Sequence, residues 1–254
     1  MNERVPDSRS RLSHDVSLPW FGDLRERRLV DERMDDPGID PQHLERALQG
    51  IRRINVMSRA AASLWPVLRP LASEKPIRVL DLASGGGDVA VAIARKARRS
   101  NLPITVEGCD ISATAVRVAQ NVASHHGVEV RFFEHDAIRS GVPEGFDVIY
   151  SSLFFHHLST PQVQHLLQNM ANVAQTIIVN DLVRCRTGLL IAYAGCHTLS
   201  RSPVVHFDGP SSVAAAFTIP EFRAVADEAG LSNYSVSWRW PFRFLFTHTR
   251  ASDS

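Results

Sequence analysis

Residues 77–88 read Ile-Arg-Val-Leu-Asp-Leu-Ala-Ser-Gly-Gly-Gly-Asp. The apolar run predicts a buried strand that ends near Asp81, the three glycines predict a tight turn, and Val89–Ala94 begins a helix. In this order, a strand, a glycine turn and a helix can hold a nucleotide-like ligand, because the backbone approaches the ligand closely at the glycines.

The charges around this turn indicate which ligand it holds. Gly85, Gly87 and Ala90 formally fit the dinucleotide fingerprint Gly-x-Gly-x-x-Ala. However, Asp81 and Asp88 flank the turn, and two carboxylates repel a diphosphate. The same carboxylates attract the ammonium and sulfonium of S-adenosylmethionine, so the charge pattern favours this cofactor.

Two later acids support this choice. Asp110 ends the next predicted strand and is followed by Ile111. A carboxylate at this position can accept hydrogen bonds from both ribose hydroxyls, as an acid does in nucleotide-binding folds. The strand predicted over residues 128–134 is followed by Asp136 and Ala137. There we expect Asp136 to accept a hydrogen bond from the adenine amino group.

These motifs resemble those of the Rossmann-like S-adenosylmethionine-dependent methyltransferases, whose first motif is an acid followed by Gly-x-Gly-x-Gly. Ala83 replaces the first of these glycines and still allows close backbone approach. The resemblance covers roughly residues 77 to 249. It implies cofactor contacts at Asp81, Ala83, Ser84, Gly85, Gly87, Asp110, Ile111, Asp136, Ala137 and Ser151.

Predicted strands and helices alternate along the chain, as a doubly wound parallel sheet requires. The fourth and fifth strands are predicted over residues 146–150 and 176–180. Residues 234–240 and 243–249, separated by Pro241, predict a closing hairpin that is similar to the family's last two strands. We therefore expect an α/β fold with a doubly wound, mostly parallel seven-stranded sheet whose last strand is antiparallel.

Two segments are expected outside the sheet. Residues 1–72 form an N-terminal extension, helical from about residue 40, where Asp40 and Pro41 predict a helix start. In many small-molecule methyltransferases such helices cover the active site. Residues 73–254 form the cofactor-binding domain, and within it the long connection at about residues 182–217 predicts a substrate lid.

Composition excludes several classes of partner. The 254 residues carry a net charge of +1 without a block of like charges, so we expect no nucleic-acid partner. The three cysteines lack Cys-x-x-Cys spacing and read as reduced thiols, which favours a cytoplasmic location. No apolar run approaches the roughly 18 residues that span a bilayer, so we expect no membrane insertion. The sequence leaves open whether the chain forms a homodimer.

The fourth predicted strand leads into His156 and His157, at the sheet edge where ligands bind in such folds. An imidazole with a pKa of about 6.5 can accept a proton from a phenol or an acidic carbon. The alternative is that one histidine packs against the adenine and the other faces solvent. We favour His157 as the catalytic base because it is further from the strand end. In the predicted lid, His197, Arg201 and His206 are second choices for polar contacts.

The sequence lacks the motifs of two subtypes of this family. Ser151-Ser152-Leu153-Phe154 stands where amino-group methylases of nucleic acids and proteins commonly carry Asn/Asp-Pro-Pro-Tyr/Phe. Only Asn180-Asp181, in reversed order, corresponds to the magnesium site of catechol-type enzymes. One carboxylate and one amide make a poor magnesium site, so we expect no metal.

The sequence thus predicts a metal-independent S-adenosylmethionine-dependent methyltransferase that acts on a small aromatic or apolar acceptor. It most resembles ubiquinone/menaquinone-type enzymes and bacterial natural-product methyltransferases of secondary metabolism. We expect hydroxyl methylation of a phenolic or polyketide-like compound, with carbon methylation of a quinone precursor as the alternative. An NAD-binding oxidoreductase and a non-catalytic cofactor-binding module are the rivals from other classes.

Overall fold

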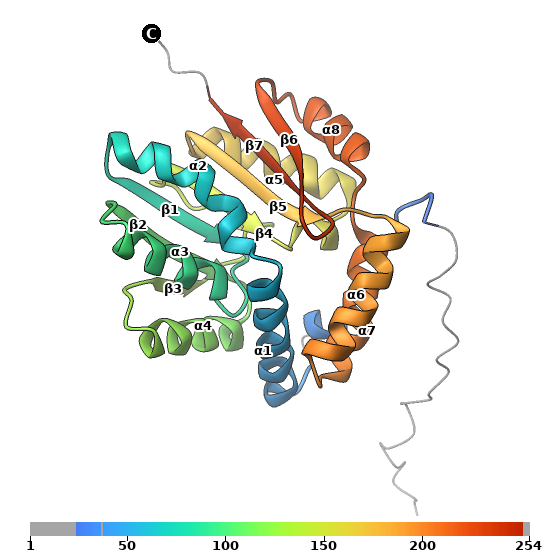
Figure 1. Ribbon diagram of the computed structural model, residues 1–254. Helices are drawn as coiled ribbons and strands as arrows, with labels where there is room; N and C mark the ends of the chain where they lie inside the picture. Colours follow the sequence, from blue (N-terminus) through green and yellow to red (C-terminus); the bar gives the residue numbers. More distant parts are fainter. Residues whose placement is uncertain (1–23, 37, 251–254) are drawn as a thin grey trace, which may run out of the picture.

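The computed structural model describes residues 24–36 and 38–250, and most of them form one α/β unit (Figure 1). Its seven-stranded sheet has the order β3-β2-β1-β4-β5-β7-β6. The strands are β1 (Ile77–Leu82), β2 (Ile104–Asp110), β3 (Arg131–Glu134), β4 (Val148–Ser152), β5 (Thr176–Leu182), β6 (Tyr234–Arg239) and β7 (Arg243–Thr249). Strands β1 to β5 pair in parallel, whereas β7 is antiparallel to both β5 and β6. The predicted fold class is therefore confirmed.

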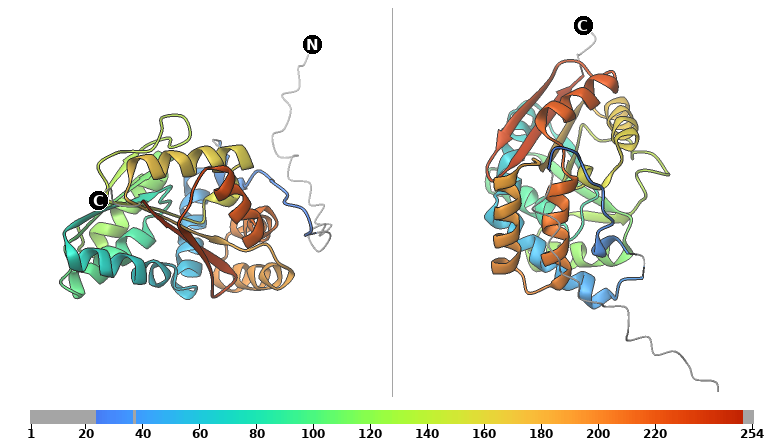
Figure 2. Two further views of the ribbon diagram at one scale, coloured as in Figure 1. Left: turned by 90° about the horizontal axis from the view of Figure 1, so that it is seen from above. Right: turned by 90° about the vertical axis from the view of Figure 1, so that its right-hand side faces the viewer.

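Helices cover both faces of this sheet (Figure 2). On one face, α2 (Ala60–Glu74), α3 (Asp88–Arg99) and α4 (Ala113–His125) bury their apolar sides against Val79 and Val106. On the other face, α5 (Thr160–Val173) and α8 (Ile219–Glu228) pack against Leu80 and Leu82. Because successive side chains of a strand point to opposite faces, neighbouring residues of β1 pack in the two hydrophobic cores on opposite faces of the sheet.

Three further helices lie together beside the carboxyl edge of the sheet: α1 (Pro41–Met57), α6 (Arg186–Leu199) and α7 (Pro203–Ala215). They share an apolar cluster of Ala47, Cys196 and Val205. Asp40 caps α1 as predicted, since its carboxylate accepts from the backbone N–H groups of Gln42 and His43. These helices form the wall above the strand ends.

Several predicted boundaries shift. Strand β4 begins and ends two residues later than predicted, and β3 is shorter. The predicted lid at residues 182–217 is mostly the α6–α7 pair, of which α7 was not predicted. The first 23 residues of the predicted N-terminal extension lie outside the described residues. Within the described part of the chain, no helix has the length and apolar character to cross a membrane.

Candidate active site

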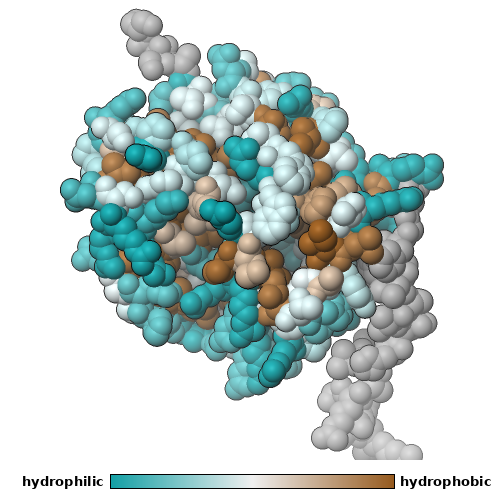
Figure 3. All heavy atoms as spheres, viewed as in Figure 1, coloured by the Kyte–Doolittle hydropathy of each residue, from teal (hydrophilic) through white to brown (hydrophobic). Residues whose placement is uncertain are grey.

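A cavity of about 1010 Å³ lies between the carboxyl edge of the sheet and the α1, α6 and α7 helices. Its walls are largely apolar, with Leu48 and Ile54 from α1 and Ile191 from α6. Figure 3 shows brown, hydrophobic side chains on the surface where α6 and the tip of the β6–β7 hairpin lie in this view. Leu190 of α6 and Trp240, between β6 and β7, are both exposed. The cavity therefore suits a ligand with a substantial apolar part.

The glycine turn forms one end of the cavity. Ala83, Gly85 and Gly87 adopt positive φ angles of 59°, 50° and 71°. At Gly87 a Cβ atom would lie 2.6 Å from the Cβ of Ala119 and 2.7 Å from the ring of Phe132, so a side chain does not fit. The turn can thus pack tightly against α4 and β3 only with glycine here.

Asp110 ties the end of β2 to this turn. Its Oδ2 accepts from the backbone N–H of Gly85 at 2.8 Å, and its Oδ1 accepts from that of Ser112 at 2.9 Å. A carboxylate oxygen can accept more than one hydrogen bond. Both oxygens can therefore also accept from a diol in the cavity that Asp110 lines.

The other residues predicted to bind the cofactor lie at the same end, with one exception. Ile111, Asp136 and Ala137 line the cavity. Asp136 already accepts through Oδ1 from the backbone N–H groups of Ile138 and Arg139, both at 3.0 Å. Ser151 is not a lining residue. It is buried, and its hydroxyl donates to the carbonyl of Leu82 at 2.8 Å.

Buried acids give this end of the cavity a negative character. Burial raises the pKa of Asp81 well above its usual value, and the negative charges of Asp88 and Asp110 raise it further. Burial also raises the pKa of Asp88, whereas a hydrogen bond from Asn55 and the charge of Arg243 act in the opposite direction. A cationic group placed beside Asp81 would favour its ionised form.

Two buried polar atoms here have no hydrogen-bond partner among the described residues: the Oγ of Ser84 and the Nη1 of Arg243. Both residues line the cavity. Arg243 is 1% exposed and donates through Nη2 to the Oδ1 of Asn55 at 3.0 Å. Burial lowers the pKa of Arg243 to about 10, opposed by the charges of Asp181 and Asp88. A ligand bound in the cavity can supply partners for both atoms.

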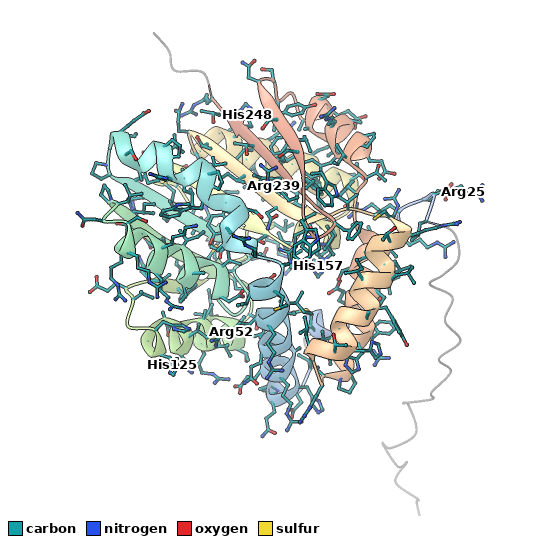
Figure 4. All side chains as sticks on the ribbon, in the orientation of Figure 1. Arg25, Arg52, His125, His157, Arg239 and His248 are labelled. Carbon is teal, nitrogen blue, oxygen red and sulfur yellow. The ribbon has the colours of Figure 1, made fainter. Side chains whose placement is uncertain are left out.

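The other end of the cavity contains both histidines that the sequence singled out. His156 and His157 lie on the short 3-10 helix η3 (Phe155–His157) after β4, and His157 lies near the centre of the molecule, close to α1, α6 and the hairpin (Figure 4). Arg27 holds this backbone in place, since its Nη2 donates to the carbonyls of His156 at 2.9 Å and Leu158 at 2.7 Å.

Two carboxylates flank these imidazoles. The Nδ1 of His156 lies 2.6 Å from the Oδ1 of Asp181, and its Nε2 lies 3.7 Å from the Oε1 of Glu32. The Nε2 of His157 lies 3.8 Å from the Oε2 of the same glutamate. Burial lowers the pKa of His156, but the charge and hydrogen bond of Asp181, together with Glu32, raise it to about 10. The two carboxylates thus favour the protonated form of His156, which makes this imidazole a poor proton acceptor.

Glu32 is a site residue that the sequence analysis missed. It lies before a short 3-10 helix, η2 (Arg33–Asp35), in the N-terminal segment. Asp208 of α7 accepts from the backbone N–H groups of Arg33 at 2.9 Å and Met34 at 3.1 Å, and Ser212 donates to Glu32. Charged residues are rarely buried, so nothing in the local sequence signals a glutamate with 7% exposure.

The second-choice contacts of the predicted lid do not reach the cavity. His197, Arg201 and His206 are absent from its described lining. His197 and His206 stack on each other with ring centroids 4.2 Å apart, and His206 also contacts the carbonyl of Ser200 through Nε2 at 2.8 Å. These two histidines thus connect α6 and α7.

Known proteins resemble this chain in sequence and in fold. Residues 79–176 match the methyltransferase domain family. The chain is 36% identical over 91 residues to a demethylmenaquinone methyltransferase of Thermus thermophilus, covering 35% of this chain and 40% of that protein. It is 28% identical over 129 residues to a ribosomal protein L11 methyltransferase of Bradyrhizobium diazoefficiens, covering 48% and 41%. The chain thus spans about two fifths of the length of these curated relatives.

Solved structures share the fold at lower identity. A putative O-methyltransferase of Nostoc punctiforme superposes with a TM-score of 0.57 at 17% identity, covering 76% of this chain and 56% of that chain. Magnesium protoporphyrin IX methyltransferase of Synechocystis with bound S-adenosylhomocysteine gives 0.54 at 16% identity, covering 77% and 84%. At these identities the likeness concerns the fold.

Proposed function

We propose that this chain, which carries a class I S-adenosylmethionine-dependent methyltransferase domain, transfers a methyl group to a small-molecule acceptor. The cofactor is S-adenosylmethionine, which supplies an electrophilic methyl group on its sulfonium when bound. The domain match removes the reason to read the glycine turn as an NAD site. The observation that carries the proposal is one cavity that joins the glycine turn and Asp110 to the histidine pair.

The residues around the glycine turn fit this cofactor. Asp110 lines the cavity beside the glycine turn, where its carboxylate can accept from the ribose hydroxyls. Asp81, whose pKa is raised by burial among other acids, would be neutralised by the ammonium group. The unpartnered Nη1 of Arg243 and Oγ of Ser84 can bind polar atoms of the methionyl part. We assign Ile111, Asp136 and Ala137 to the adenine end.

The acceptor occupies the part of the cavity beside α6, α7 and the histidines. The volume of about 1010 Å³ is at the upper end of the range for ligand pockets, so there is room for an acceptor beside the cofactor. The apolar walls favour an aromatic or otherwise apolar compound. We propose a phenolic or polyketide-like compound that is methylated on a hydroxyl.

His157 and His156 are the proposed catalytic residues. Both line the cavity, and Asp181 orients His156 through the 2.6 Å contact to Nδ1. Their task is to hold the acceptor oxygen in line with the methyl group and to favour its ionised form. The acceptor loses its hydroxyl proton to His157, the oxygen–methyl bond forms as the methyl–sulfur bond breaks, and S-adenosylhomocysteine is the leaving group.

Carbon methylation of a quinone precursor is the second candidate. It is favoured by the 36% identity over 91 residues to a demethylmenaquinone methyltransferase. The same histidines would then face an acidic ring carbon in place of a hydroxyl. The two products differ chemically, because an O-methyl ether is cleaved by boron tribromide and a C-methyl group is not.

The test is turnover with methyl-labelled S-adenosylmethionine on a panel of phenols and hydroxynaphthoquinones, followed by mass spectrometry. We expect a singly methylated product with one class of acceptor. His157→Ala should abolish most of this turnover while calorimetric binding of S-adenosylhomocysteine persists. A chain that binds the cofactor but methylates nothing across this panel would favour the non-catalytic module.

A further inference from the structure

Glu32, His156 and His157 offer three metal-binding atoms at the acceptor end of the cavity. All three atoms lie within 4.8 Å of one another. They come from segments far apart in the sequence, because Glu32 belongs to the N-terminal segment and the histidines follow β4. We propose that these three side chains bind one divalent transition-metal ion, with Zn²⁺ as the best match.

The distances fit an ion better than hydrogen bonds. The contacts of 3.7 Å from Glu32 to His156 and 3.8 Å from Glu32 to His157 are longer than the roughly 2.7–3.2 Å of a nitrogen–oxygen hydrogen bond. Two ligands bound to zinc at about 2.0–2.1 Å in a tetrahedron lie roughly 3.4 Å apart. The two contacts involve different oxygens of Glu32, and the three ligand atoms as a set lie within 4.8 Å. The side chains would therefore have to close by at most about 1.4 Å to bind one ion.

The residues around the three proposed ligands hold them in fixed orientations, as metal-binding histidines require. The Nδ1 of His156 lies 2.6 Å from Asp181, which leaves its Nε2 to face the cavity. Asp181 is itself fixed, because its two oxygens accept from the backbone N–H groups of His156 at 3.0 Å and Leu182 at 2.7 Å. Ser212 donates to the carboxylate of Glu32. Carboxylates and hydroxyls in such positions orient metal ligands and fix the histidine tautomer.

The chemistry of the ligands selects the ion. Two imidazoles and one carboxylate suit zinc and its first-row neighbours, whereas magnesium and calcium prefer oxygen ligands. Glu32 and Asp181 also place two carboxylates with 7% and 1% exposure around the site, and a dication would offset their charge. This inference departs from the metal-free expectation, which considered only Asn180 and Asp181.

The ion would have an open position toward the cavity, since all three ligands line it. Its role rests on the proposed function: it would bind the acceptor oxygen and lower the pKa of that hydroxyl. With the ion bound, His157 is a metal ligand and not the base, so the hydroxyl proton leaves to solvent. The oxygen–methyl bond forms and the methyl–sulfur bond breaks. A protonated His156 between two carboxylates, with no ion, is the rival arrangement.

The test measures metal binding directly, with the untagged full chain after treatment with a chelator and dialysis. Titration with Co²⁺ should give the visible absorption of a low-coordinate site at one ion per chain, and Zn²⁺ should abolish it by displacement. Glu32→Gln and His157→Gln should each remove this absorption. Asp181→Asn should weaken binding by about 10–100-fold, because it removes only the orienting carboxylate. His135→Gln is the matched control, since His135 lines the same cavity away from the cluster and should leave the absorption unchanged.

Binding of S-adenosylhomocysteine and far-ultraviolet circular dichroism establish that each variant is folded. No cobalt absorption in the parent chain, or an undiminished signal in both Glu32→Gln and His157→Gln, overturns the metal site and leaves the rival arrangement. The proposed function is judged separately by methyl transfer. Full turnover in chelator-treated protein would refute the metal's role in catalysis and leave the methyltransferase assignment intact. Stoichiometric metal binding without turnover on any acceptor would count against the methyltransferase assignment and leave the metal site intact.

Discussion

At the scale of single residues, Asp110 joins the glycine turn to the predicted ribose site through its contacts to Gly85 and Ser112. Asp110→Ala should lose two hydrogen bonds from the ribose to a charged acceptor, which are worth roughly 3 kcal/mol or more together. We expect cofactor affinity to fall by over about a hundredfold. Calorimetry with S-adenosylhomocysteine measures this, with the exposed Glu144→Ala as control. Unchanged affinity in a folded Asp110→Ala chain would disprove the ribose assignment.

Asp81 has opposite effects on stability and on binding. Its carboxyl is protonated in both the folded and the unfolded chain below the usual pKa of 3.8, and the unfolded chain loses the proton first as the pH rises. Because the folded-state pKa is raised, stability of the ligand-free protein falls between these two pKa values. Asp81→Asn should therefore raise the melting temperature at about pH 8, and do so far less near about pH 4.

The same substitution should weaken S-adenosylmethionine binding, because it removes the charge that attracts the ammonium group. Thermal shift without ligand and calorimetry with ligand measure the two effects. An Asp81→Asn chain that is less stable at both pH values, or that binds the cofactor as well as the parent, would contradict this account of the buried carboxylate.

The sequence reveals Asp81 and Asp110 because each follows a predictable strand and belongs to a local motif. Glu32 is different, since its place beside His156 depends on the N-terminal segment folding back against α7. Arg243 is another such case. It begins the last strand and meets Asn55 of α1, a contact between residues that are 188 positions apart. A local pattern does not encode such contacts.

At the scale of elements, the glycine turn gives a matched pair of substitutions. Gly87 and Gly127 both have positive φ angles, of 71° and 58°, but only Gly87 is crowded by Ala119 and Phe132. Gly127→Ala should cost about 1 kcal/mol from backbone strain alone. Gly87→Ala should cost about 1–3 kcal/mol more from overpacking and should also weaken cofactor binding. Equal losses in urea unfolding would show that crowding at the turn is unimportant.

The accuracy of the predicted elements follows the strength of their local signals. The helix start at Asp40 is confirmed, because its carboxylate accepts from the neighbouring backbone N–H groups of Gln42 and His43. Helix α7 was missed because Gly209 and Pro210 usually interrupt a helix. A Cβ on Gly209 would lie 2.2 Å from the Sγ of Cys196, so glycine allows α6 and α7 to approach closely. Only tertiary packing explains this helix.

At the scale of the whole molecule, Arg184 connects three distant parts of the chain. With 4% exposure, it donates to Glu221 of α8 at 2.8 Å, to the carbonyl of Ala216 at 2.6 Å and to the carbonyl of Leu24 at 3.0 Å. Arg184→Met should lower the free energy of unfolding by about 2–3 kcal/mol, because buried acceptors lose a charged donor. Urea unfolding measures this loss, and the exposed Arg201→Met is the control. A change no larger than that of the control would show that Arg184 does not stabilise this junction.

The central claim is that one cavity binds S-adenosylmethionine at the glycine turn and the methyl acceptor at the histidines. The most direct measurement is calorimetric titration of the untagged chain with S-adenosylhomocysteine and, in parallel, with NAD. The account predicts saturable binding of one S-adenosylhomocysteine per chain, loss of that binding in Asp110→Ala, and no heat with NAD. Binding of NAD in place of S-adenosylhomocysteine, or binding of S-adenosylhomocysteine that survives Asp110→Ala unchanged, would contradict it.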